Sequence, residues 1–201
     1  MRKLLTAAAM AVSASSAFSA PVTSPTDFTP TAPVVDFEAF VLGTASPITV
    51  GPMTVAAPGY IVRAQNFTQY PGIFEGQYFG QASSSTVTIT FDVAVRAVGF
   101  GLFDPNFPAT QLQAFDAAGD LLETVFPPTG PIGGGFSTFT GVVRNIAEIR
   151  SVVVTPQSGD LIAIDTISWA TSIEPIPVPP AAALLLGGVG VLAGFRRRRS
   201  S

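Results

Sequence analysis

Residues 86–93 read TVTITFDV, and this stretch decides the fold class. Polar and apolar residues alternate strictly along it, which is the period of a strand and not of a helix. The apolar side chains should face one side of the strand, and these are Val87, Ile89, Phe91 and Val93. The polar side chains should face the other side, and these are Thr86, Thr88, Thr90 and Asp92. Such a strand buries its apolar face against a second layer and leaves its polar face to solvent.

The neighbouring segments carry the same strand signals. Residues 34–41 (VVDFEAFV) are β-branched and aromatic with interleaved acids, and residues 95–103 bring Val98, Phe100 and Leu102 into register. Two pairs of short apolar runs each enclose a glycine-containing turn. In the first pair, residues 112–115 and 121–125 enclose the turn 116–120. In the second pair, residues 151–155 and 161–169 enclose the turn 156–160. We predict a β-hairpin at each turn, and an all-β antiparallel sandwich over residues 34–171.

The chain ends differ from this domain. Residues 1–20 have the layout of a secretory signal peptide, with Arg2 and Lys3 before an apolar run over residues 4–12 and then small residues. Residues 21–33, rich in Pro, Thr and Ser, predict an extended, solvated linker. Residues 172–180 form a second proline-rich linker. An apolar helix is predicted at residues 181–195, before an arginine cluster that completes the segment 181–201.

The composition limits the chemistry. Six of the ten basic residues lie in the two terminal segments, which leaves four arginines against all thirteen acids. A domain this acidic, without a basic stripe, excludes nucleic acid as a partner. The chain has no cysteine, which excludes disulfides. It has no histidine either, which excludes the Ser-His-Asp triad and the usual zinc sites. Carboxylates are then the only acid–base groups available, and no catalytic residues are assigned.

The C-terminal segment combines a proline motif, a short apolar run and four arginines. As a helix, its 15 apolar residues would span about 22 Å, against a hydrocarbon core of about 30 Å. By the positive-inside rule the arginines stay in the cytoplasm and the rest of the chain is exported. The residues of this motif are Ile176, Pro177, Val178, Pro179, Pro180 and Ala181, followed by Arg196, Arg197, Arg198 and Arg199.

This order resembles the PEP-CTERM class of C-terminal sorting signals. It is most similar to the variant that reads Val-Pro-Leu-Pro-Ala, with Ile176 and Val178 as departures. The resemblance implies a Gram-negative-type bacterium in which an exosortase removes the tail after transient membrane contact. The exported protein would reach the cell surface, outer membrane or extracellular matrix. The alternative is an ordinary C-terminal membrane anchor.

The domain itself resembles the small secreted jelly-roll domains that occur with this kind of tail, which are similar to carbohydrate-binding sandwiches. The matching pieces are residues 36–38 (DFE), 97–100 (AVGF), 112–116 (LQAFD) and 164–167 (IDTI). The resemblance implies a jelly-roll-like fold and leaves the ligand open.

A first candidate site consists of three carboxylates. If the first and last strands pair, Asp36, Glu38 and Asp165 could converge and hold calcium, which prefers several hard oxygen ligands. The alternative is that all three face solvent on half-buried strands.

A second candidate site lies in the aromatic stretch 67–79. Tyr70, Phe74 and Tyr78 could stack on sugar rings, with Gln69, Glu75 and Gln77 as hydrogen-bond partners. The alternative is that the phenylalanines of this stretch close one end of the core.

Three functions follow from these observations. The leading hypothesis is an exported, non-enzymatic structural or adhesive protein that associates with exopolysaccharide. The others are a carbohydrate-binding module and a carbohydrate-active hydrolase that uses an Asp/Glu pair.

Overall fold

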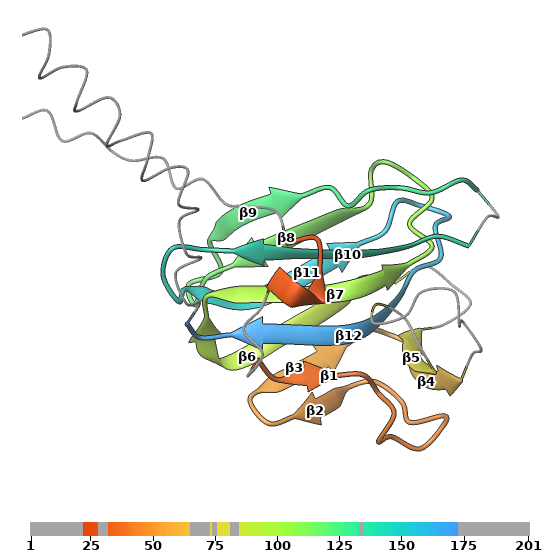
Figure 1. Ribbon diagram of the computed structural model, residues 1–201, viewed down its shortest axis with the longest axis horizontal. Coiled ribbons are helices and arrows are strands. Elements are labelled where there is room, and N and C mark those ends of the chain that lie inside the picture. Colours follow the sequence, from red (N-terminus) through yellow and green to blue (C-terminus); the bar gives the residue numbers. More distant parts are fainter. Residues whose placement is uncertain are drawn as a thin grey trace, which may run out of the picture.

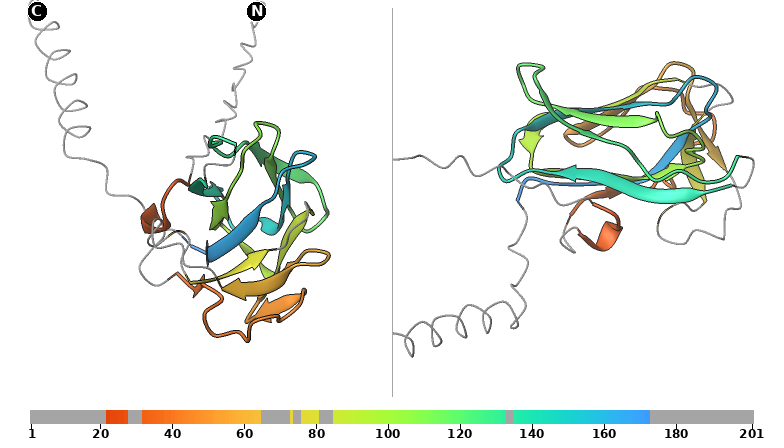
Figure 2. Two further views of the ribbon diagram at one scale, coloured as in Figure 1. Left: turned by 90° about the vertical axis from the view of Figure 1, so that its right-hand side faces the viewer. Right: turned by 90° about the horizontal axis from the view of Figure 1, so that it is seen from above.

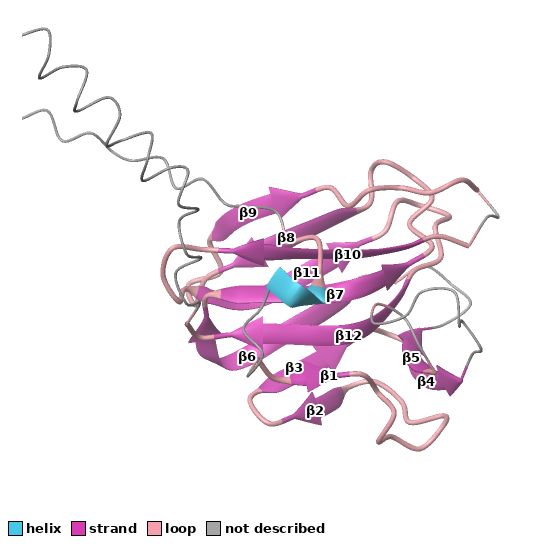
Figure 3. Cartoon of the chain, viewed as in Figure 1, coloured by secondary structure: helices cyan, strands magenta, loops and turns pink. Residues whose placement is uncertain are grey.

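The computed structural model describes residues 22–27, 32–64, 73, 76–80, 85–132 and 135–172. In these residues the chain forms two antiparallel sheets packed face to face (Figures 1 and 3). This confirms the prediction of an all-β fold with two antiparallel sheets. Within the same residues, no helix is both long enough and apolar enough to cross a membrane.

Each sheet has six strands in the described ranges. Sheet A has the order β10 (Ser137–Val143), β7 (Ala97–Phe103), β12 (Ala163–Ala170), β5 (Gln77–Gly80) and β4 (Ile61–Ala64), with β1 (Val34–Val35) also paired to β12. Sheet B has the order β2 (Ile48–Val50), β3 (Met53–Ala56), β6 (Val87–Val95), β11 (Ile149–Thr155), β8 (Gln111–Phe115) and β9 (Leu121–Val125).

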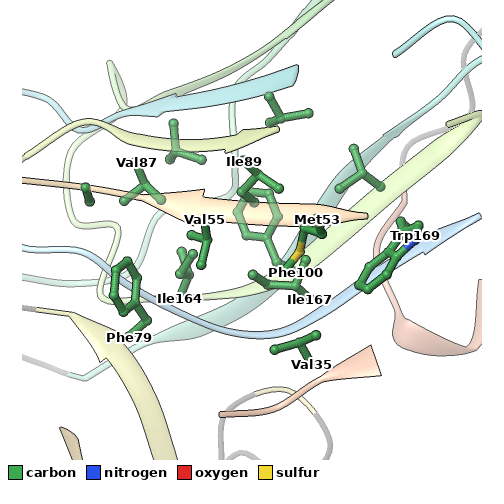
Figure 4. Packing of buried hydrophobic residues seen from close by; sticks show 14 of the residues in the cluster. Val35, Met53, Val55, Phe79, Val87, Ile89, Phe100, Ile164, Ile167 and Trp169 are labelled. Carbon is green, nitrogen blue, oxygen red and sulfur yellow. The ribbon is translucent and has the colours of Figure 1, made fainter. Parts of the chain in front are cut away.

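The core lies between the two sheets. Ile89 of β6 and Phe100 of β7 point into this space from opposite layers and are fully buried (Figure 4). Phe91 is 3% exposed, and its ring centroid lies 5.9 Å from that of Trp169 on β12. The predicted apolar faces of residues 86–93 and 95–103 are therefore core faces, apart from one residue.

The exception is Val93, which was predicted to face inward and is 48% exposed. The reason is a shift in register between β6 and β11: Thr90 pairs with Ser151, whereas Val95 pairs with Ile149. The extra residues on β6 form a bulge, which interrupts the alternation at Asp92 and Val93, and the chain returns to the core at Val95.

The first predicted hairpin is confirmed. β8 and β9 pair around a turn in which Gly119 has φ of 85°. An Asp116 carboxylate oxygen accepts hydrogen bonds from the backbone N–H groups of Ala118 and Asp120, both at 2.9 Å.

The second predicted hairpin is wrong. β11 pairs with β6 and β8 in sheet B, whereas β12 pairs with β7, β5 and β1 in sheet A. Residues 156–162 therefore cross from one sheet to the other. The buried carboxylate of Asp160 connects this crossing to the loop between β7 and β8. It accepts hydrogen bonds from the Asn106 N–H and the Thr110 hydroxyl of that loop. A turn with a glycine at positive φ, here Gly159 at 88°, suits a sheet crossing as well as a hairpin.

The first strand is shorter than predicted. Only Val34 and Val35 pair with β12, opposite Ser168 and Ile167, which confirms that the first and last strands of the predicted domain are neighbours. The chain then turns at Phe37, whose φ is 62°. The Phe37 ring is buried and stacks on Phe79 at 5.7 Å, so core packing takes this residue out of the strand.

The outer face of sheet A is covered in part. Val22, 3% exposed, bridges to Gly141 and packs with Ala97, Phe139 and Ala170. The short η1 helix (Pro25–Asp27) lies outside the layer that holds β10 and β12 (Figure 2). Val22, which lies in the predicted linker of residues 21–33, is therefore packed on the domain, whereas Thr23 and Asp27 of the same segment are exposed.

Candidate functional site

The outer face of sheet B carries a continuous row of side chains. Residues directly opposite each other in paired strands lie on the same side of the sheet. The row crosses all six strands of sheet B, with each residue paired to the next: Thr49, Thr54, Thr90, Ser151, Phe115 and Leu121. Four hydroxyl groups thus stand on four successive strands, followed by an aromatic ring and a leucine.

A second row runs beside the first, two residues away along β3, β6, β11 and β8 and three residues away along β9, where the pairing with β8 is irregular. Its members, paired in the same way, are Ala56, Thr88, Val153, Gln113 and Thr124. Thr155 and Gln111 begin a third row. We refer to the outward side chains of these three rows as the hydroxyl face.

The hydroxyl face points outward because the other face of each strand is apolar. On β6, Val87, Ile89 and Phe91 are buried, whereas Thr88 is half-buried and Thr90 is exposed. β11 and β8 show the same alternation of buried and half-buried residues. Burial of the apolar set fixes the direction of the polar set, since the strand period is two.

Part of the face is internally hydrogen-bonded and part is available to a ligand. The hydroxyl groups of Thr49 and Thr54 lie 2.9 Å apart, and the Thr90 hydroxyl donates to the Thr54 carbonyl at 3.4 Å. In the described part of the chain, the side chains of Thr88, Gln113 and Thr124 have no hydrogen-bond partner. Their donors and acceptors can therefore bind an external group.

The hydroxyl face is uncharged in an otherwise acidic chain. None of its three rows contains Asp, Glu, Lys or Arg. Asp92, two residues beyond Thr90 on β6, is the next acid along that strand. Arg144 lies instead beside the edge strands and binds Glu123 at 3.3 Å and Glu148 at 2.7 Å. The hydrogen bond to Glu148 is the main reason why the pKa of Arg144 is raised.

The structure does not bring the three predicted calcium ligands together. An Asp36 oxygen accepts from the Glu38 N–H at 3.3 Å, while the Glu38 carboxylate accepts from the Gln77 N–H. Asp165 is 1% exposed and accepts from the Thr166 N–H at 2.7 Å. Among the described residues, no three or more Asp or Glu side chains form a group that could hold a metal ion. The turn at Phe37 and the irregularity of β12 between Asp165 and Ser168 account for this, because both interrupt the strand geometry that the prediction assumed.

The predicted aromatic site is described only in part. Tyr70 and Phe74 lie outside the described residues, as do the sorting-motif residues 176–181 and 196–199. Tyr78 is half-buried on β5, opposite Arg63 of β4. Phe79 is fully buried between Phe37 and Tyr60, which is the core position that the alternative interpretation gave to the phenylalanines of this stretch.

Sequence reasoning missed the hydroxyl face as a site. The alternation over residues 86–93 predicted that three threonines share the solvated side of one strand, and this signal was present. The rows themselves follow from which strands are neighbours and in which register they pair. Neither property can be read from one strand.

No protein-family model and no curated protein matches the chain. Among solved structures, the chain is similar to the K2 cleaved adhesin domain of Lys-gingipain. The identity is 9%, the alignment covers 72% of this chain and 100% of that chain, and the TM-score is 0.49. It is also similar to the carbohydrate-binding module CsCBM6-3 from Clostridium stercorarium, whose structure is a complex with cellobiose. The identity is 17%, the alignment covers 67% of this chain and 99% of that chain, and the TM-score is 0.36.

A third similar structure is the family 11 carbohydrate-binding module of the cellulase Lic26A-Cel5E of Clostridium thermocellum. The identity is 8%, the alignment covers 72% of this chain and 96% of that chain, and the TM-score is 0.32. With TM-scores below 0.5, these likenesses carry no weight in assigning a function to this chain.

Proposed function

We propose that this chain is an exported, non-catalytic β-sandwich that binds a neutral polysaccharide through the hydroxyl face. The observation that carries the proposal is the row of four hydroxyls and one aromatic ring across sheet B. A structural or adhesive role in an exopolysaccharide matrix is the biological form that this binding would take.

The chemistry of the face suits sugars. Sugar hydroxyls both donate and accept hydrogen bonds, as do the hydroxyl and amide groups of Thr88, Gln113 and Thr124. Phe115 is half-buried in the row and could offer one side of its ring to a sugar face.

The charge balance indicates a neutral sugar polymer. The chain carries thirteen acids, and only four basic residues lie outside its terminal segments. An anionic polymer would be repelled by the surface around the face, whereas a neutral polymer would not.

Export and sorting are a separate part of the proposal. They are supported by the signal-peptide layout of residues 1–20 and by the three-part tail at residues 176–199. We propose that an exosortase-type enzyme processes the tail and releases the domain to the cell surface or matrix.

The test uses full-length protein and a panel of polysaccharides. We expect depletion of the protein from solution by at least one neutral polymer among glucan, xylan, mannan and chitin, and no depletion by polygalacturonate. The concentration of reducing sugar ends, which rises when glycosidic bonds are hydrolysed, should not increase during the incubation. Absence of binding to every neutral polymer would refute the function, and release of reducing ends would favour the hydrolase instead.

Two matched variants localise the binding. Phe115→Ala should weaken binding about tenfold, which corresponds to about 1.4 kcal/mol and to the loss of one stacking contact. Phe103→Ala removes another half-buried strand phenylalanine, but from sheet A, and should leave the affinity unchanged. Melting curves of both variants confirm that they remain folded. Equal losses in the two variants would place the site elsewhere.

A further inference from the structure

We propose that the hydroxyl face recognises a surface of aligned, uncharged polymer chains and not a single free chain. This inference rests on the proposed polysaccharide binding and specifies its ligand. Three properties of the face carry it: the two-dimensional order of its side chains, its openness, and its lack of charge.

The side chains of the face form a two-dimensional array. Neighbouring strands lie about 4.8 Å apart, so the row from Thr49 to Leu121 extends over about 24 Å across the sheet. Residues two apart in one strand, such as Thr88 and Thr90, repeat about every 6.7 Å in the other direction. A single sugar chain lies along one line and engages one row at a time. A layer of aligned chains can engage both rows together.

The face is also open. In the described part of the chain, the N-terminal segment packs on sheet A, and η1 lies outside sheet A in Figure 2. The carbonyl oxygen of Ile73 approaches sheet A so closely at Gly101 that a Cβ atom on this residue would overlap with it. These elements cover part of the outer face of sheet A, whereas every residue in the three rows of sheet B is half-buried or exposed.

Openness disfavours a single chain as the ligand. Sites for small ligands usually bury most of the ligand surface within a cleft. The residues of the hydroxyl face all stand on strands of one sheet, so they contact a ligand from one side only. One-sided contacts are individually weak, and binding becomes strong when many act together on an extended ligand.

Charge and composition disfavour other macromolecules. The three rows contain no Arg or Lys that could bind phosphate or carboxylate groups. They also contain none of the Trp, Tyr and Arg residues that dominate binding energy at protein–protein interfaces. A neutral, hydroxyl-rich surface is the partner that remains complementary to these side chains.

The experiment presents the same sugars in two forms. Full-length protein is incubated with insoluble microcrystalline cellulose, chitin and mannan, and separately with soluble cellohexaose, chitohexaose and mannohexaose. We expect retention by at least one insoluble polymer, and binding to the matching hexaose that is at least tenfold weaker per sugar unit.

A pair of variants tests whether the array is responsible. Thr90→Lys places a long side chain in the middle of the first row and should reduce retention at least tenfold. Thr171→Lys makes the same change at an exposed position after β12 of sheet A and should have no effect. Both positions are exposed, so both variants should fold, which melting curves verify.

The outcomes separate the two proposals. Equal binding of polymer and hexaose would overturn the inference about aligned chains and leave polysaccharide binding intact. Retention that is insensitive to Thr90→Lys would also overturn the inference, because binding would then occur away from the array. Binding to neither form of any sugar would refute the proposed function as well.

Discussion

The hydroxyl group of Tyr60 donates a 2.8 Å hydrogen bond to the backbone carbonyl of Ile162, 102 residues further along the chain. Tyr60 follows β3 and precedes β4, and Ile162 ends the crossing from β11 to β12. The Tyr60 side chain is fully buried, with its ring 5.3 Å from that of Phe79. This contact ties two connections between the sheets to each other at one end of the sandwich.

Loss of the Tyr60 hydroxyl should destabilise the fold while the ring packing is kept. Tyr60→Phe leaves the buried carbonyl of Ile162 without this donor, so we expect the free energy of unfolding to fall by about 1–3 kcal/mol. Urea denaturation measures the change. Tyr60→Ala also removes the ring and should cost about 3–5 kcal/mol in total. Wild-type stability in Tyr60→Phe would mean that the hydrogen bond does not contribute.

The same residue predicts a loss of stability in alkali. Burial raises the pKa of Tyr60 above its ordinary value of 10.0, because the charged phenolate is poorly solvated in the core. Above about pH 10 the unfolded state loses this proton and the folded state keeps it, so stability falls as the pH rises. The expected slope is about 1.4 kcal/mol per pH unit. Denaturation curves at pH 9 and pH 11 should show this fall in wild type and a smaller one in Tyr60→Phe. An equal fall in both proteins would assign the effect to other groups.

The two faces of β6 should differ sharply in their tolerance of alanine. Phe91→Ala leaves a cavity beside Trp169 and should cost about 3–5 kcal/mol. Thr90→Ala, at an exposed position of the same strand, should change the stability by no more than about 0.5 kcal/mol. Chemical denaturation of both variants makes the comparison. Similar losses at the two positions would show that both faces of the strand are buried.

The carboxylate of Asp160 should be a main support of the crossing between the sheets. Asp160→Ala leaves the Asn106 N–H and the Thr110 hydroxyl without their acceptor in a buried position, so we expect a loss of about 3 kcal/mol. Asp92→Ala is the control, because Asp92 is exposed. Thermal melting of the two variants tests the prediction, and an unchanged melting temperature in Asp160→Ala would contradict it.

The proposed sorting of the chain predicts its mature mass. If an exosortase-type enzyme removes the tail, protein extracted from the cell surface should lack Arg196, Arg197, Arg198 and Arg199. Intact-mass spectrometry of that protein gives the answer directly. Retention of the four arginines would indicate an ordinary membrane anchor.

Local sequence patterns predicted several strands of the fold, although β2 to β5 and β10 were not among them. The alternation from Val87 to Phe91 predicted a strand with a buried face, and residues 116–120 predicted the β8–β9 hairpin. Both predictions depend on properties of a few consecutive residues: the two-residue period of a strand, and the backbone freedom of a glycine such as Gly119. The pairing of the first and last strands was also anticipated, but from the usual arrangement of sandwiches.

Where the interpretation concerned other distant segments, the structure differs from it at two places. The sequence left open whether Asp36, Glu38 and Asp165 converge as a calcium site or face solvent; in the structure Phe37 leaves the strand to stack on Phe79, and β12 is irregular beside Asp165. Residues 151–155 and 161–169 were expected to form a hairpin, but they belong to different sheets.

The sequence alone therefore determined the fold class and which side chains from Val87 to Phe91 face the core, because burial of an apolar set acts on each strand separately. The tertiary structure decided which strands are neighbours, where β6 bulges, and how Thr54, Thr90 and Ser151 come to stand in one row. These properties arise from pairing between segments far apart in the chain. The free energy of that pairing comes from the packing of the whole core, which no single segment contains.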